Sequence, residues 1–170
     1  GTYAFVDVVI PREAAPGSYP LTVRTSGGNA TAPFSVAPRL AGHERFQGFG
    51  TEDVVYLLMP DRFANGDPSN DINVAPSVPA RYHGGDWQGI IDKLDYLEQL
   101  GVTALWISPV YVNPTEAREG RGDGHMYEGY HGYWPLQPRG VDPRIGGEAG
   151  LERLVAAAHG AGLRVLLDVV

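Results

Sequence analysis

The chain has 170 residues, with 13 Lys and Arg against 20 Asp and Glu and a formal net charge of −7. This acidic balance disfavours a nucleic-acid partner, which needs clustered basic residues, and it suits a protein that binds a neutral ligand or a cation. There is no cysteine, so disulfides and thiolate zinc sites are excluded, and the longest apolar runs are far too short to span a bilayer. No signal peptide is visible and both ends fall within strand-like patterns, so we expect a segment of a longer protein.

Residues 1–38 predict an all-β unit. Runs rich in β-branched and aromatic residues at 2–10, 19–25 and 30–38 are separated by turns of Pro, Gly, Ser and Asn. Three strands cannot close a sandwich, so we expect the last strands of an immunoglobulin-like β-sandwich domain. Residues 39–52 are then expected to be a linker.

From residue 53 onward, predicted strands and helices alternate. Short apolar runs at 54–60, 102–110 and 163–170 predict strands that are buried on both faces. Apolar residues at helical spacing predict helices at 86–101 and 147–162, the first with Asp86 as its N-cap and Gly101 just past its end.

This β-α-β-α-β order implies parallel strands with right-handed crossovers. The strand-to-helix connections are much longer than the helix-to-strand connections, as in a (β/α)₈ barrel whose site lies at the C-terminal ends of its strands. A doubly wound nucleotide fold would place a short Gly-rich turn after the first strand, and there is none. The fold class is therefore α/β, with residues 53–170 as the first β-α-β-α-β portion of a TIM barrel.

The loop after the first predicted strand is rich in Asp and Asn; we call residues 61–71 (DRFANGDPSND) the Asp/Asn loop. The oxygen-bearing side chains in it and in the HGGD at 83–86 are ligands that a hard cation such as Ca²⁺ takes. Glycines at 66, 84 and 85 let the backbone turn tightly enough to offer carbonyls to the same point. The alternative is that these residues simply make turns. An EF-hand is excluded, because position twelve from Asn65 is Pro76 and not Glu.

Two further features lie in or beside predicted loops. The aromatic loop, residues 129–135 (GYHGYWP), carries flat rings and a histidine that suit the apolar faces and hydroxyls of a sugar, although such rings can instead pack on their own barrel. Asp168 lies in an apolar strand, where a carboxylate needs a partner unless it simply ends the strand. Asp61 and Arg62 are expected to form a structural ion pair or hydrogen bond, and Tyr56 and Trp106 to be core or barrel-mouth residues.

The first strand, its loop and the first helix together resemble glycoside hydrolase family 13, the α-amylase family, in its cyclomaltodextrinase, neopullulanase and cyclodextrin glucanotransferase branches. The resemblance covers residues 53–170, about two thirds of the chain. It implies that the loop after the first strand holds a calcium ion. The implied ligands are Asn65, Asp67, Asn70, Asp71, the carbonyl of Gly84, and Asp86.

The same resemblance assigns roles at the aromatic loop. It implies that Tyr133 stacks on the sugar at the cleavage point, that His131 hydrogen-bonds this sugar, and that Trp134 is a supporting wall. Asp168 matches the Asp of the family's first conserved region and would anchor the site. The chain departs from the family at Gln137, where many relatives carry Asp.

The implied function is hydrolysis or transfer of α-glucosidic bonds in starch, maltodextrin, cyclodextrin or pullulan, with retention, by a two-carboxylate mechanism. The catalytic acids would lie beyond residue 170, so no catalytic residue is named here. The alternatives are a non-catalytic relative that binds glucan or a partner protein, and an unrelated barrel enzyme without the metal. The expected partners are an α-glucan and Ca²⁺, with no nucleic acid and no membrane, and a homodimer of the parent enzyme is left open. We expect a secreted or periplasmic location rather than a cytoplasmic one.

Overall fold

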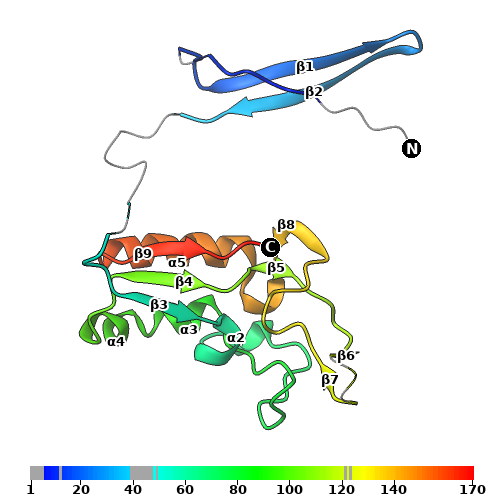
Figure 1. The fold of residues 1–170 in the computed structure, drawn as a ribbon. Helices are drawn as coiled ribbons and strands as arrows, with labels where there is room; N and C mark the ends of the chain where they lie inside the picture. The colour runs from blue at the N-terminus through cyan, green and yellow to red at the C-terminus, as the bar shows by residue number, and fades with distance from the viewer. Residues whose placement is uncertain (1–5, 12, 39–47, 49, 121, 123) are drawn as a thin grey trace. The chain divides into compact units, whose positions relative to one another are not determined.

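The computed structural model describes the chain except residues 1–5, 12, 39–47, 49, 121 and 123 (Figure 1). The chain divides into two compact units, Gly1–Gly48 and Phe49–Val170. No helix within the described residues combines the length and the apolar character that crossing a membrane requires.

The first unit contains a β-hairpin. Strands β1 (Gly17–Thr25) and β2 (Gly28–Val36) pair antiparallel, with Thr25 opposite Gly28, so the predicted strands at 19–25 and 30–38 and the turn between them are confirmed. The predicted strand at 2–10 is wrong over residues 6–10, which belong to no strand; residues 2–5 lie outside the described part. A strand needs a neighbour for its backbone groups, and the sheet described here pairs β1 with β2 alone. The immunoglobulin-like sandwich therefore stays a prediction, as does the linker at 39–52, most of which lies outside the described residues.

The second unit is built on a parallel sheet with strand order β3-β4-β9. These strands are β3 (Val55–Leu58), β4 (Ala104–Ile107) and β9 (Arg164–Leu167), with Val55 beside Ala104 and Ala104 beside Arg164. Each lies inside one of the predicted apolar runs. The alternating order with parallel strands is therefore confirmed.

Helices supply the hydrophobic core on one face of this sheet. Helices α3 (Trp87–Ile91) and α4 (Leu94–Gln99) join β3 to β4, and α5 (Gly147–Gly160) joins β4 to β9. The single helix predicted at 86–101 is wrong, because the chain makes a tight turn at Lys93 (φ −113°, ψ 9°) and its N–H bonds only three residues back. Asp86 caps α3 and Gly101 follows α4 with φ +83°, as predicted. The buried core consists of Leu58, Trp87, Ile90, Leu94, Leu97, Val102, Leu105, Ile107, Val110, Ile145, Leu154, Ala158 and Leu163.

The other face of the sheet is open in this chain. Leu57 is 60% exposed and Trp106 is 43% exposed, so the prediction that these strands are buried on both faces is wrong here. Side chains alternate across a strand, so every second residue points away from the helices. Trp106 is consequently not a core residue of this chain, whereas Tyr56 packs on the core and meets Phe63 edge-on at 6.3 Å.

The long loops have local structure of their own and lie at one end of the sheet. The first contains α2 (Pro60–Phe63) and the 3₁₀ helix η1 (Pro68–Asn70). The second contains β5 (Tyr111–Val112), β6 (Arg118–Glu119), β7 (Met126–Tyr127), β8 (Gln137–Val141) and the 3₁₀ helix η2 (Pro143–Ile145), with β5 paired to β8 and β6 to β7. Figure 1 shows both loops at the end toward which the arrows of β3, β4 and β9 point. That end is where a barrel of this kind carries its site.

Candidate functional site

The carboxylate of Asp86 organises the Asp/Asn loop. It is fully buried at 0% exposure. Its Oδ1 accepts the backbone N–H of Gly66 (3.1 Å) and of Gly89 (2.7 Å), and its Oδ2 accepts the N–H of Asp67 (2.8 Å) and Nδ2 of Asn70 (3.1 Å). One side chain thus caps α3 and fixes the loop that arrives from β3.

Asn65 and Asp71 form a second pair beside Gly84. The Nδ2 of Asn65 lies 3.0 and 2.9 Å from the two carboxylate oxygens of Asp71. Gly84 has φ +89°, and a Cβ there would lie 2.4 Å from Oδ1 of Asp71 and 2.8 Å from Nδ2 of Asn65. Only glycine can bring its backbone this close to the pair, so the structure explains the residue type at position 84.

The fit of these residues to a cation differs among the predicted ligands. Oδ1 of Asn70 is buried without a hydrogen-bond partner, which is costly for a polar atom and is relieved when the oxygen binds a cation. Asp67 instead uses its Oδ1 to accept the N–H and the hydroxyl of Ser69, and these hydrogen bonds lower the pKa of Asp67. Among the described residues no group of three or more His, Cys, Asp or Glu side chains gathers at one point. The oxygens of this loop are therefore arranged as two amide–carboxylate pairs, with Asp67 partly committed elsewhere.

Asp61 joins the two halves of the predicted motif. Its buried carboxylate accepts the backbone N–H of His83 (3.0 Å) and of Gly84 (3.2 Å) and forms the predicted ion pair with Arg62. Burial raises the pKa of Asp61, against the opposing effect of these backbone donors. The start of the Asp/Asn loop is thereby held against the HGGD segment.

Tyr133 and Asp168 meet at the C-terminal end of the sheet. The hydroxyl of Tyr133 donates to Oδ2 of Asp168 at 2.6 Å, across 35 residues of sequence. Asp168 directly follows β9 and its N–H bonds the carbonyl of Ile107 at the end of β4. The hydrogen bond to the Asp168 carboxylate raises the pKa of Tyr133, and the residue remains 41% exposed, so it is available to a ligand.

His131 lies between the other rings of the aromatic loop. Its ring is stacked on Tyr133 (5.8 Å, 27°) and meets Trp134 edge-on (4.7 Å, 87°). The backbone N–H of Tyr133 donates to Nδ1 of His131 at 3.0 Å, which requires an unprotonated Nδ1 and leaves the proton of the neutral ring on Nε2. Burial, and secondarily the charge of Arg62, lowers the pKa of His131, so the neutral ring is favoured.

Two residues that contact the aromatic loop, Arg62 and Asn113, were not predicted to do so from the sequence. The Arg62 guanidinium lies 3.7 Å from the centre of the Tyr130 ring, and Tyr130 in turn meets His131 edge-on. The side chain of Asn113 accepts the N–H of Trp134 at 2.8 Å. Neither contact is indicated by the sequence. Arg62 has an acidic neighbour, Asp61, as its evident partner, and Asn113 lies in a short apolar run before a proline.

The comparisons with known proteins agree with this architecture. The family model described as "Alpha amylase, catalytic domain" matches residues 57–170. The chain therefore belongs to the α-amylase family of glycoside hydrolases, and the described α/β unit is part of that family's TIM-barrel domain. Its relatives in this family are α-amylase-type enzymes.

Individual relatives cover the same part of the chain. It is 44% identical over 123 residues to the periplasmic α-amylase of Escherichia coli strain K12, a match covering 68% of this chain and 18% of the relative. It is 37% identical over 126 residues to neopullulanase 2 of Thermoactinomyces vulgaris, covering 70% of this chain and 19% of the relative. The crystal structure of an Anoxybacillus α-amylase matches with a TM-score of 0.60 and 41% identity over 69% of this chain and 23% of that one. The chain thus spans about a fifth of the length of these curated relatives.

Proposed function

We propose that this chain forms part of an enzyme that hydrolyses or transfers α-glucosidic bonds in an α-glucan. The observation that carries the proposal is the pairing of Tyr133 with Asp168 at the C-terminal end of the sheet, inside a domain of the α-amylase family. This end of the barrel is where such folds do their chemistry. An exposed ring next to a carboxylate suits a sugar, which presents apolar C–H faces rimmed by hydroxyls.

Three residues of the aromatic loop have a proposed role in binding one glucose unit. Tyr133 stacks on the sugar, and its hydroxyl stays oriented by Asp168. His131 offers Nε2–H to a sugar oxygen, because Nδ1 is occupied by the N–H of Tyr133. Trp134 supports the His131 ring, which it meets edge-on. The bond-breaking carboxylates, one nucleophile and one acid/base, come in this proposal from sequence beyond Val170.

The Asp/Asn loop is proposed to bind Ca²⁺. The ligands would be Asn65, Asn70, Asp71, Asp86, the carbonyl of Gly84 and the remaining oxygen of Asp67. Support comes from the buried, unpartnered Oδ1 of Asn70 and from the pairing of Asn65 with Asp71 against Gly84. A bound cation would neutralise the carboxylates of the loop and hold its carbonyls. Asp61 in turn holds the start of this loop against the HGGD segment.

The substrate proposal is tested on the product of the whole gene that contains this chain, with maltoheptaose as substrate. We expect turnover with an α-anomeric first product, detected by proton NMR, as retention requires. Tyr133→Ala should lower kcat/KM at least about tenfold through the lost ring contact. Tyr96→Ala is the matched control, since Tyr96 is an exposed tyrosine on α4. Binding of glucan without turnover would support the non-catalytic glucan-binding alternative in place of the enzyme. The absence of both binding and turnover would refute both proposals.

The metal proposal is tested by calorimetric titration of the chelator-treated protein with Ca²⁺. We expect saturable binding at one site, weakened about tenfold by Asn70→Ala, since one oxygen ligand is lost. Asn29→Ala, an exposed asparagine of the β-hairpin, should leave the affinity unchanged. No heat of binding above that of buffer would refute the site.

Two properties of the whole protein follow the same proposal. A secreted or periplasmic location is favoured by the likeness to a periplasmic α-amylase, and cell fractionation with an antibody to this chain tests it. A homodimer of the parent enzyme is tested by light scattering after size-exclusion chromatography, where a monomer mass would exclude it.

A further inference from the structure

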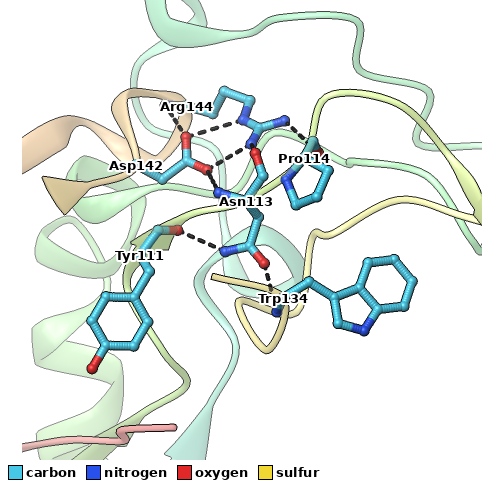
Figure 2. Close-up of polar contacts among 6 residues, drawn as sticks. All are labelled: Tyr111, Asn113, Pro114, Trp134, Asp142 and Arg144. Carbon is cyan, nitrogen blue, oxygen red and sulfur yellow. Dashed lines mark hydrogen bonds and ion pairs between the residues drawn. The ribbon is translucent and has the colours of Figure 1, made fainter. Parts of the chain in front are cut away.

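Asn113 is buried, and its backbone N–H and carbonyl and both ends of its side-chain amide each make a hydrogen bond. It follows β5 directly and is 2% exposed. Its backbone N–H donates to Oδ2 of Asp142 (3.2 Å), and its carbonyl accepts from Nη2 of Arg144 (2.7 Å). Its side-chain Nδ2 donates to the carbonyl of Tyr111 (2.7 Å), and its Oδ1 accepts from the N–H of Trp134 (2.8 Å). Figure 2 shows Asn113 at the centre of this network.

The backbone of Asn113 is fixed by a buried ion pair. Nε of Arg144 lies 3.0 Å from Oδ1 of Asp142, and Nη2 lies 2.7 Å from Oδ2, so the two planar groups meet in a two-point contact (Figure 2). The guanidinium also lies 4.2 Å from the centre of the Tyr82 ring. Two-point pairs of this kind have a defined geometry, so the peptide of Asn113 is held at a fixed distance from η2.

The side chain of Asn113 transmits this fixed position to the aromatic loop. The N–H that it accepts belongs to the peptide joining Tyr133 to Trp134, which is one bond from the Cα of Tyr133. At the other end of the loop, a Cβ on Gly129 would lie 2.8 Å from the Cβ of Asn113, so this glycine packs directly on the Asn113 side chain. Asn113 therefore contacts the aromatic loop near both of its ends.

We propose that Asn113 is a positioning residue that sets the place of the Tyr133 ring at the sugar-binding end of the barrel. This inference rests on the proposed function and deepens it by naming the residue that holds the Tyr133 ring, on which the sugar is proposed to stack. The chain of contacts runs from the Asp142–Arg144 pair to the Asn113 backbone, through its side-chain oxygen to the Trp134 peptide, and so to Tyr133 and Asp168.

The chemistry of an amide explains why Asn is required here. At this buried site the side chain must donate to one carbonyl and accept from one N–H. Leucine has a similar shape but makes neither hydrogen bond. Aspartate keeps the acceptor for the N–H of Trp134 but turns a carboxylate oxygen toward the carbonyl of Tyr111.

The experiment compares Asn113→Leu and Asn113→Asp with Thr103→Val in the whole gene product. Thr103 is the matched control, because its hydroxyl donates to Asp53 (2.7 Å) and accepts from the N–H of Val54 (2.9 Å) at the N-terminal end of the strands, away from the aromatic loop. Rates are measured on maltoheptaose and scaled to the folded fraction. Backbone hydrogen exchange is followed by mass spectrometry in peptides that contain residues 129–136.

We expect Asn113→Leu to raise hydrogen exchange in residues 129–136. It should also lower kcat about 10- to 100-fold with KM changed less, because a displaced Tyr133 ring would no longer orient the reacting sugar correctly. Asn113→Asp should retain the Trp134 bond and lose less than Asn113→Leu in both readouts. Thr103→Val should leave kcat within about twofold of wild type and the exchange of residues 129–136 unchanged.

Two results would overturn the proposal: unchanged exchange in residues 129–136 for Asn113→Leu, or raised exchange with wild-type kcat in the folded protein. A wild-type protein that turns over no glucan would refute the proposed function instead. The exchange measurement would then still decide whether Asn113 positions the aromatic loop, since it needs no substrate.

Discussion

Replacing Asp86 by Asn tests how far one buried carboxylate organises the Asp/Asn loop. The carboxylate accepts four hydrogen bonds, two on each oxygen, from Gly66, Gly89, Asp67 and Asn70. An amide of the same shape has one acceptor oxygen, and its NH₂ group would face two of these donors. Hydrogen bonds to a charged group contribute about 1.5–3 kcal/mol each, so losing two should lower the free energy of unfolding by about 3–6 kcal/mol.

The assay is urea unfolding of the protein after chelator treatment, repeated with Ca²⁺ at about 100 times its dissociation constant. Wild type should gain about 2.7 kcal/mol from the ion under the proposed metal site, and Asp86→Asn should gain less because a ligand is lost. The matched control is Asp92→Asn, an exposed carboxylate just after α3 that accepts Nε2 of Gln88 at 2.8 Å. This control should change the unfolding free energy by no more than about 0.5 kcal/mol.

A loss below about 1 kcal/mol for Asp86→Asn, or a loss equal to that of Asp92→Asn, would refute the reasoning. Such a result would mean that the loop keeps its geometry without the charge-assisted hydrogen bonds. An equal gain from Ca²⁺ in wild type and variant would separately remove Asp86 from the proposed ligands.

Three further predictions concern the metal loop, the sugar platform and pH. Gly84→Ala should weaken Ca²⁺ binding at least about tenfold in titration calorimetry, because a left-handed backbone (φ +89°) and a Cβ 2.4 Å from Asp71 oblige the pair to move. Tyr133→Phe should lower kcat/KM by roughly tenfold while keeping the ring, through loss of the bond to Asp168. Hydrogen bonds from the Gly50 N–H and then from Thr103 lower the pKa of Asp53 in the folded protein, so its contribution is present above the ordinary value of 3.8 and is lost as the pH falls through the lowered pKa. Asp53→Asn should therefore flatten the decline of stability that occurs as the pH falls from about 3.8 through the lowered pKa of Asp53, as measured by urea midpoints. An unchanged slope over this pH range would contradict the prediction for Asp53. Wild-type Ca²⁺ affinity in Gly84→Ala, or wild-type kcat/KM in Tyr133→Phe, would contradict the other two.

The sequence predicted the elements of the second unit well where the local pattern is strong. The three apolar runs each contain a parallel strand, and the helix at 147–162 is observed as α5. Asp86 is an N-cap because a short carboxylate before an apolar helical pattern meets the free N–H groups of the first turn. The same pattern did not reveal the turn at Lys93, because both halves of the segment share one apolar face.

The candidate site was predicted residue by residue only with the help of family resemblance. Tyr133 and Asp168 were both named, and their hydrogen bond across 35 residues places them at one end of the sheet. Asp67 illustrates a limit, because its carboxylate bonds Ser69, two residues further on. Composition gives the number of oxygens in such a loop but not the direction in which each points.

The sequence by itself determined the α/β order, the position of the Asp/Asn loop and the identity of the rings in the aromatic loop, since these follow from periodicity, turn residues and motif. Only the tertiary structure decided that Asn113, Asp142 and Arg144 fasten the aromatic loop, and that Arg62 lies on Tyr130. The physical reason is the separation of the partners along the sequence. Local patterns report contacts within a few residues, whereas these hydrogen bonds join residues that are 21 to 31 positions apart. Whether a buried amide such as Asn113 bonds a distant backbone N–H or a neighbouring residue is decided only when the distant segment is in place.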